Sequence, residues 1–196
     1  MHGAEPAGSS ATLDRPLELL ERALAFTRPV LVRVAGHDAG EPTPCAPWDL
    51  GDLLSHMVDG FTAFLQGAAG LVSPYDAPAL PRDPALLAGH LRDLGCGVLG
   101  DWATTSRRET LLGLVPLPTD RLLEVAALEI AVHGWDLSRV CASDHVLPPE
   151  LAAGLLPLAV RRVGPLDRPG RFGPVLEPVR RDPASLLLAQ LGRLSP

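Results

Sequence analysis

Residues 120–140, DRLLEVAALEIAVHGWDLSRV, form the most informative segment of the sequence. From residue 125 to residue 132 the segment is apolar almost all round, as is typical of a helix that is buried in a protein core. Glu129 and His133 stand within and directly after this run, four residues apart and therefore on one face of a helix. A carboxylate and an imidazole that are buried together cost free energy unless they are paired, hydrogen-bonded or bound to a metal ion.

A second helix is expected from residue 48 or 49 to about residue 66, with Asp49 as its N-cap and Asp52 three residues on. Its apolar face contains His56, which stands between Leu53 and Met57. In helical bundles, metal sites are built from side chains that converge from facing helices. This histidine, with the glutamate and histidine of the first segment, would supply two nitrogen ligands and one oxygen ligand. Such a set suits a divalent ion such as Zn²⁺ and leaves at least one coordination position open.

Each of these residues also has a simpler interpretation. Glu129 and His133 could hydrogen-bond to each other across one helical turn, and His56 could be a core histidine with satisfied hydrogen bonds. Asp59 and Asp136 follow the two histidines by three residues, where they could orient the imidazoles or be solvated acids.

The other helices are marked by their caps and their periodicity. Asp83-Pro84 gives a cap followed by proline at the first helical position, and Thr119 or Asp120 is expected to cap the fourth helix. Pro29 is expected to kink or divide the first helix. The expected helices, besides the second, cover residues 13–35, 84–102, 119–141, 149–163 and 184–194.

The segments between the helices are short or rich in proline. Residues 106–118 are expected to form an extended connection, and the proline-rich residues 164–183 cannot form a continuous helix. The pattern predicts an all-α protein, a bundle of four long helices with additional short helices. We expect one domain at residues 13–196, after a flexible N-terminal tail at residues 1–12.

Composition excludes several function classes. The 17 basic residues, all of them arginine, and 23 acidic residues give a net charge of −6, which argues against a nucleic-acid-binding protein. No apolar run approaches the roughly 20 residues that cross a bilayer, and the N-terminus has no secretory signal, so we expect a cytoplasmic protein. Cys45, Cys96 and Cys141 are too widely spaced for a disulfide framework or a zinc knuckle. Cys45 stands in the loop before the second helix, where it could lie near the site or be a packed, inert thiol.

The segments PTPCAPWDLGDLLSHMVDG at 42–60 and LEIAVHGWDLSRV at 128–140 resemble the DinB-like metal-binding superfamily of actinobacteria. More closely, they resemble the N-terminal domain family of mycothiol-dependent maleylpyruvate isomerase. The ending at 172–196 resembles the tail of small single-domain members. The resemblance implies a DinB-like four-helix bundle with a divalent metal, usually zinc. It places the ligands on His56, Glu129 and His133, although many relatives have histidine where Glu129 stands.

The resemblance also implies a reaction type. In the isomerase, the metal is thought to bind the thiol of mycothiol as a thiolate, which adds to an electron-poor double bond. Rotation about the resulting single bond, followed by elimination, completes the isomerisation, and thiol transfer would use the same first step. The isomerase has a second domain that contributes to its active site, whereas this sequence ends at Pro196. We therefore expect a zinc- and mycothiol-dependent transferase or isomerase for another small electrophilic substrate.

Two other functions stay open from the sequence. The same residues could form a non-catalytic structural or regulatory metal site, or the bundle could be a metal-dependent biosynthetic enzyme that uses no thiol. No catalytic residue apart from the metal centre itself is identified. The candidates for the lining of a substrate pocket are aromatic: Trp48, Phe61, Phe64, Trp102 and Trp135.

Overall fold

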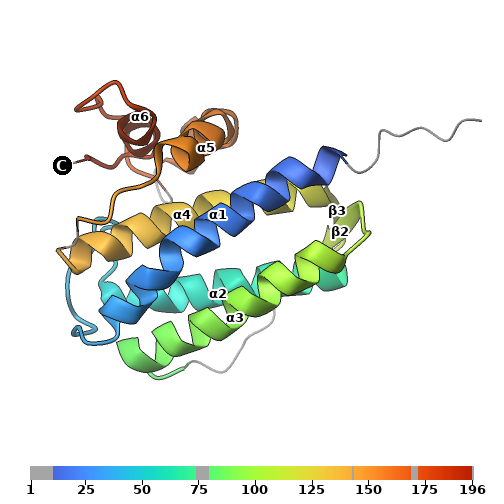
Figure 1. The fold of residues 1–196 in the computed structure, drawn as a ribbon, viewed down its shortest axis with the longest axis horizontal. Helices are drawn as coiled ribbons and strands as arrows, with labels where there is room; N and C mark the ends of the chain where they lie inside the picture. Colours follow the sequence, from blue (N-terminus) through green and yellow to red (C-terminus); the bar gives the residue numbers. More distant parts are fainter. Residues whose placement is uncertain (1–10, 74–79, 143, 169–171, 196) are drawn as a thin grey trace, which may run out of the picture.

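The computed structural model describes residues 11–73, 80–142, 144–168 and 172–195. Of the tail predicted at 1–12, residues 1–10 lie outside this part of the chain, and the first helix begins at Ala11. Four long helices lie side by side as a bundle, and two shorter ones pack against one flank (Figure 1). The helices are α1 (Ala11–Val34), α2 (Leu50–Ala69), α3 (Pro84–Thr104), α4 (Thr119–Val140), α5 (Pro149–Arg162) and α6 (Pro183–Gln190), with a 3₁₀ turn at Pro165–Asp167. The predicted all-α bundle with additional short helices is confirmed.

The bundle is held together by one continuous apolar core. α1 packs along α4 and against α3, while α2 packs against α3 and α4. α5 packs on α4 and α1, and α6 packs on α5. Within the described residues, no helix is both long and apolar enough to cross a membrane.

Of the N-caps predicted for α2, α3 and α4, the first two are present and the third is not. Asp49 caps α2 through a capping box, in which its side chain accepts from the backbone N–H of Asp52 at 2.9 Å. Asp83 caps α3 as predicted. The prediction that Thr119 or Asp120 caps α4 was wrong, because the N-cap position is Pro118 and no side chain caps it. The Thr119 hydroxyl instead donates to the carbonyl of Arg107 at 2.8 Å, which ties the start of α4 to the preceding connection.

Of the two outcomes expected at Pro29, a kink or a division of the first helix, the division does not occur. α1 is a single helix from Ala11 to Val34 with Pro29 inside it. Phe26, Val30 and Leu31 are buried on either side of this proline. Their burial keeps this segment against the core and outweighs the loss of a backbone hydrogen bond.

The connection predicted at 106–118 contains a β-hairpin. β2 (Glu109–Leu112) and β3 (Val115–Pro118) pair antiparallel, and β1 (Leu71–Val72) pairs with β2 in parallel. The turn of the hairpin uses Gly113 with φ of 61°, and the Thr110 hydroxyl donates to the carbonyl of Gly67 in α2. This small sheet therefore closes one end of the bundle.

Helices α1 and α4 approach closely at Thr27 and Gly134. The Thr27 hydroxyl of α1 donates to the carbonyl of Ile130 in α4 at 2.9 Å. A methyl group on Gly134 would overlap this Thr27 side chain. Glycine at position 134 is therefore what lets the two helices approach beside His133.

We expect Gly134→Ala to lower the free energy of unfolding by about 1–3 kcal/mol, because the added methyl overpacks the α1–α4 contact. Gly100→Ala is the matched control, since Gly100 lies in α3 with open space around its Cα. It should raise the free energy of unfolding by about 0.5–1 kcal/mol through helix propensity alone. Urea denaturation followed by circular dichroism measures both. Equal effects of the two substitutions would contradict the close approach.

Candidate metal centre

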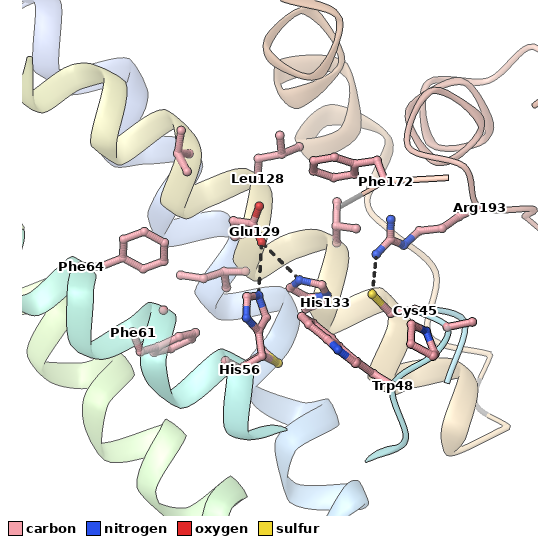
Figure 2. A pocket seen from close by; sticks show the side chains of 17 residues that line it. Cys45, Trp48, His56, Phe61, Phe64, Leu128, Glu129, His133, Phe172 and Arg193 are labelled. Carbon is pink, nitrogen blue, oxygen red and sulfur yellow. Dashed lines mark hydrogen bonds and ion pairs between the residues drawn. The ribbon is translucent and has the colours of Figure 1, made fainter. Parts of the chain in front are cut away.

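The structure brings together the three residues that the sequence singled out. His56 comes from the N-terminal half of α2, and Glu129 and His133 come from adjacent turns of α4 (Figure 2). The Glu129 carboxylate Oε2 lies 3.8 Å from Nε2 of His56 and 3.2 Å from Nε2 of His133. One potential ligand atom from each residue lies within 4.8 Å of the other two. Two imidazoles and one carboxylate therefore converge on a single point.

These distances fit the residues to a divalent cation. Ligands about 2.0–2.1 Å from a tetrahedral zinc ion stand about 3.3 Å apart. The side chains of His56 and Glu129 are 41% and 32% exposed, and both line a cavity. A cation held there would have protein ligands on one side and open positions on the other. The same positions also satisfy the simple Glu129–His133 pair that the sequence left as an alternative.

Asp136 contacts the His133 ring at Nδ1, on the side away from Glu129. Its Oδ2 lies 3.0 Å from Nδ1 of His133, so the other ring nitrogen, Nε2, faces Glu129. Asp136 is fully buried, and Arg193 donates from Nε to its Oδ1 at 2.8 Å and from Nη2 to its Oδ2 at 2.7 Å. A carboxylate behind a histidine ligand fixes the orientation and tautomer of its ring. Asp136 thus matches the orienting role considered for it.

Asp59 matches the interpretation as a solvated acid. Its side chain is exposed on α2, and no hydrogen bond joins it to His56 in the described part of the chain. The ring of Trp48 packs on His56 instead, with the ring centroids 4.5 Å apart.

The charges of the cluster are strongly coupled. Burial alone would raise the pKa of the Glu129 carboxyl, but hydrogen bonds with His133 and His56 hold it well below its usual range. Burial alone would lower the pKa of His133, but hydrogen bonds to Asp136 and Glu129 outweigh burial and raise it to about 9. Burial would raise the pKa of Asp136, and Arg193 and His133 instead lower it. Glu129, His133, Asp136 and Arg193 therefore stabilise one another as charged groups.

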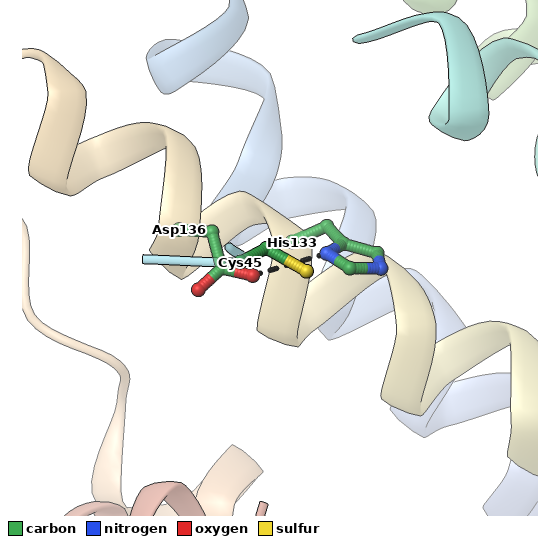
Figure 3. A group of neighbouring side chains, drawn as sticks. All are labelled: Cys45, His133 and Asp136. Carbon is green, nitrogen blue, oxygen red and sulfur yellow. Dashed lines mark hydrogen bonds and ion pairs between the residues drawn. The ribbon is translucent and has the colours of Figure 1, made fainter. Parts of the chain in front are cut away.

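Cys45 lies beside His133 and Asp136 as a second group of potential ligands (Figure 3). Both Asp136 oxygens already accept from Arg193, and one also bonds to His133. The Cys45 sulfur accepts from Arg193 Nη2 at 3.6 Å, and burial raises the pKa of the thiol despite the nearby guanidinium. Cys45 therefore contributes to the cavity wall as a neutral thiol.

The cavity has a volume of about 500 Å³ and lies directly over the three converging residues. Of the aromatic candidates, Trp48, Phe61 and Phe64 line it (Figure 2). Trp102 and Trp135 do not, because Trp102 donates to the carbonyl of Phe64 at 3.0 Å and Trp135 is buried in the core. The prediction was therefore wrong for these two residues.

Sequence reasoning missed Phe172 and Arg193, which also line the cavity. Arg193 stands 57 residues after Asp136, and only the packing of α5 and α6 on the bundle brings the two together. The sequence contains no local signal that joins them.

Three other histidines within the described residues lie away from the cavity. His37 pairs with Glu41 at 3.0 Å, and His90 is exposed on α3. His145 stacks on Phe26 with ring centroids 4.5 Å apart, and its Nε2 lies 2.8 Å from the carbonyl of Phe26.

Known proteins are similar to this chain in fold and in sequence. Two solved structures, of the mycothiol-dependent maleylpyruvate isomerase and of a histidine-to-alanine variant of it, superpose with TM-scores of 0.56 and 0.57 at 17% and 18% identity. Each match covers 75% of this chain and 69% of the other. At that identity the likeness concerns the fold.

Sequence comparisons find relatives that match a larger share of the chain. Uncharacterized proteins from two strains of Mycobacterium tuberculosis are each 31% identical over 188 residues, which covers 91% of this chain and 97% of theirs. The family model described as the mycothiol maleylpyruvate isomerase N-terminal domain matches residues 20–138. This range contains the three converging residues and ends before Phe172 and Arg193. The chain belongs to the family of mycothiol maleylpyruvate isomerase N-terminal domains.

Proposed function

We propose that His56, Glu129 and His133 hold a divalent cation, most readily Zn²⁺, and that the protein is a thiol-dependent transferase or isomerase for a small electrophilic substrate. The thiol is mycothiol, in keeping with the family. The observation that carries the proposal is the convergence of two imidazole nitrogens and one carboxylate at the wall of a cavity of about 500 Å³. When bound, such a cation would hold a coordinated thiol as its anion at neutral pH.

The side chains around the site favour this role. Asp136, which is paired with Arg193, hydrogen-bonds to Nδ1 of His133, and Trp48 packs against the His56 ring. The imidazoles are thus oriented before any ligand enters, which lowers the cost of ordering them on binding. Apolar side chains cover most of the cavity wall and strengthen electrostatic interactions at its base.

The partial exposure of His56 and Glu129 favours an open, catalytic metal site over a purely structural one. Structural zinc sites have four protein ligands in a closed sphere. Here only three residues converge, and two of them are partly exposed to the cavity. The described residues therefore favour a site with room for a thiol or a substrate.

Elemental analysis and a turnover assay test the proposal together. The purified protein should contain about one zinc per chain. It should also couple mycothiol to 1-chloro-2,4-dinitrobenzene with release of chloride, and a chelator should abolish this activity. His90→Ala, which changes an exposed histidine of α3, is the control and should keep both properties. A full zinc complement without thiol binding or thiol-dependent turnover would refute the thiol-dependent function.

Zinc affinity is expected to fall as the pH falls below about 9, because His133 in the metal-free protein has a pKa of about 9. At lower pH its ring is protonated and must lose a proton before Nε2 can bind a cation. The apparent affinity should therefore drop by up to about tenfold per pH unit. Competition with a chromophoric chelator between pH 6 and pH 9 measures this slope. An affinity that is constant between pH 7 and pH 9 would contradict the assigned charge state.

A further inference from the structure

One wall of the cavity comes from the C-terminal part of the chain. Phe172 and Arg193 form this wall, and the other lining residues come from the loop before α2, from α2 and from α4. Both residues stand beyond residue 138, where the match to the family model ends. The base of the cavity, with His56, Glu129 and His133, therefore lies in the part of the chain that the family shares, and the C-terminal wall lies outside it.

Two glycines that pack backbone against backbone hold the C-terminal wall together. A methyl group on Gly192 would lie 2.7 Å from the Cα of Gly173, and Gly192 has a φ of 77°, which favours glycine. Phe172 directly precedes Gly173, and Arg193 directly follows Gly192. The contact between the two glycines therefore brings the two cavity side chains to the same wall.

Hydrogen bonds fix Phe172 in this position. Nη1 of Arg168 donates to the carbonyl of Gly173 at 2.9 Å and to the carbonyl of Gln190 at 3.1 Å. The backbone N–H of Phe172 donates to the carbonyl of Asp167 at 3.2 Å. The Phe172 side chain packs against the core but is only partly buried, so part of its ring is accessible to a ligand in the cavity. The ring is thus positioned before a ligand enters, which lowers the cost of binding.

Aromatic side chains are concentrated at this cavity. The chain contains four Phe, three Trp and one Tyr, and four of these eight residues line the cavity: Trp48, Phe61, Phe64 and Phe172. Only 17 residues line it in a chain of 196, so the aromatic share of the lining far exceeds that of the chain. In the view of Figure 2, Glu129 lies between Phe64 and Phe172. Because aromatic rings pack favourably on one another, this cavity suits a ligand with an aromatic ring next to the polar base.

We propose that Phe172 is a specificity-determining residue and that the substrate of this site is an electrophile that contains an aromatic ring. The ring packs on Phe172, and the electrophilic carbon faces the base of the cavity. The reaction at that carbon rests on the proposed function, whereas the binding of an aromatic ring at Phe172 does not. Ring binding is also independent of a cation at the base, since a phenyl side chain has no ligand atom for one.

An uncharged fluorescent probe with aromatic rings, N-phenyl-1-naphthylamine, tests the binding. In titrations of the purified protein, we expect about one probe per chain, and Phe172→Ala should weaken its binding about tenfold. Phe172→Tyr keeps the ring and should bind the probe within about twofold of the wild type. Leu166→Ala is the matched control, because Leu166 is 97% exposed in the same part of the chain and does not line the cavity. It should leave the affinity unchanged.

Phe172→Leu guards against a loss of the fold, because it keeps an apolar side chain against the core and removes only the ring. Circular dichroism should show the same helix content as in the wild type, and the probe should bind about threefold more weakly. Wild-type affinity in both Phe172→Ala and Phe172→Leu, or the absence of probe binding to the wild type, would overturn the proposal.

Turnover of two electrophiles that release chloride separates ring recognition from the reaction. With 1-chloro-2,4-dinitrobenzene or chloroacetamide, the sulfur of mycothiol forms a bond to carbon, the carbon–chlorine bond breaks, and the thiol proton passes to solvent. Only the first of the two has a ring. Phe172→Ala should raise the KM for 1-chloro-2,4-dinitrobenzene about tenfold with kcat nearly unchanged, and the KM for chloroacetamide should stay constant. Equal changes for both electrophiles, or a fall in kcat alone, would contradict a role in ring recognition.

The two tests separate this inference from the proposed function. A protein that binds the probe through Phe172 but contains no zinc and catalyses no thiol reaction would keep the aromatic site and lose the proposed function. Conversely, zinc- and thiol-dependent turnover with probe binding and KM values that Phe172→Ala leaves unchanged would keep the proposed function and refute this inference.

Discussion

Replacing His133 with alanine is expected to weaken zinc binding by more than about 100-fold, which exceeds the 10- to 100-fold cost of losing a residue that only supports a ligand. His133 provides the nitrogen nearest to Glu129, at 3.2 Å, and its ring is the part of the site that Asp136 orients. The bound metal per chain after dialysis, measured by elemental analysis, should fall from about one to near zero. Thiol-dependent turnover should fall with it.

His56→Ala separates loss of a ligand from loss of the fold. His56 is 41% exposed, and Asp136 and Arg193 stay paired without it, so this variant should fold normally. It should nevertheless lose zinc as His133→Ala does. His90→Ala on the exposed surface of α3 should retain a full complement. Zinc retained at wild-type affinity by both His56→Ala and His133→Ala would show that these residues do not form the metal site.

Replacing Arg193 with alanine is expected to lower the free energy of unfolding by about 3–5 kcal/mol, because it leaves the buried carboxylate of Asp136 without its guanidinium partner. Asp136 is fully buried and Arg193 is 6% exposed, so the substitution removes an ion pair that is largely shielded from solvent. The substitution should also weaken zinc binding by about 10- to 100-fold, since Asp136 would orient His133 less firmly. Urea denaturation and zinc competition measure the two effects.

Two further variants give this prediction its controls. Arg161→Ala removes an exposed arginine whose nearest carboxylate, Glu124, lies 3.8 Å away, and it should cost less than about 1 kcal/mol. The double variant Arg193→Met with Asp136→Leu removes both charges and should recover much of the stability, though not the zinc affinity. If Arg193→Ala and Arg161→Ala destabilise the protein equally, the buried pair does not have the role assigned to it.

Local signals in the sequence were enough to predict much of the fold. Asp49 with Asp52 and Asp83 with Pro84 are capping patterns within four residues, and both occur as predicted. The four-residue spacing of Glu129 and His133 likewise puts the two side chains together on α4. Such features depend on the geometry of one helix alone, so the sequence is sufficient to predict them.

Features that depend on tertiary packing could not be predicted. Pro29 stays inside α1 because its neighbours are buried. The Thr119 hydroxyl does not cap α4 because it donates to the carbonyl of Arg107. The β2–β3 hairpin is too short, and too rich in proline, for a clear strand pattern. Arg193 reaches Asp136 only through the packing of the C-terminal helices, and no spacing in the sequence reveals this contact.

The most direct test of the account is a crystal structure of the purified protein with diffraction data on both sides of the zinc absorption edge. We predict one anomalous peak per chain, about 2.0–2.2 Å from Nε2 of His56, Nε2 of His133 and a carboxylate oxygen of Glu129. The remaining coordination position should open into the cavity of about 500 Å³. No peak at this point, or a metal bound by Cys45 and Asp136 instead, would contradict the account.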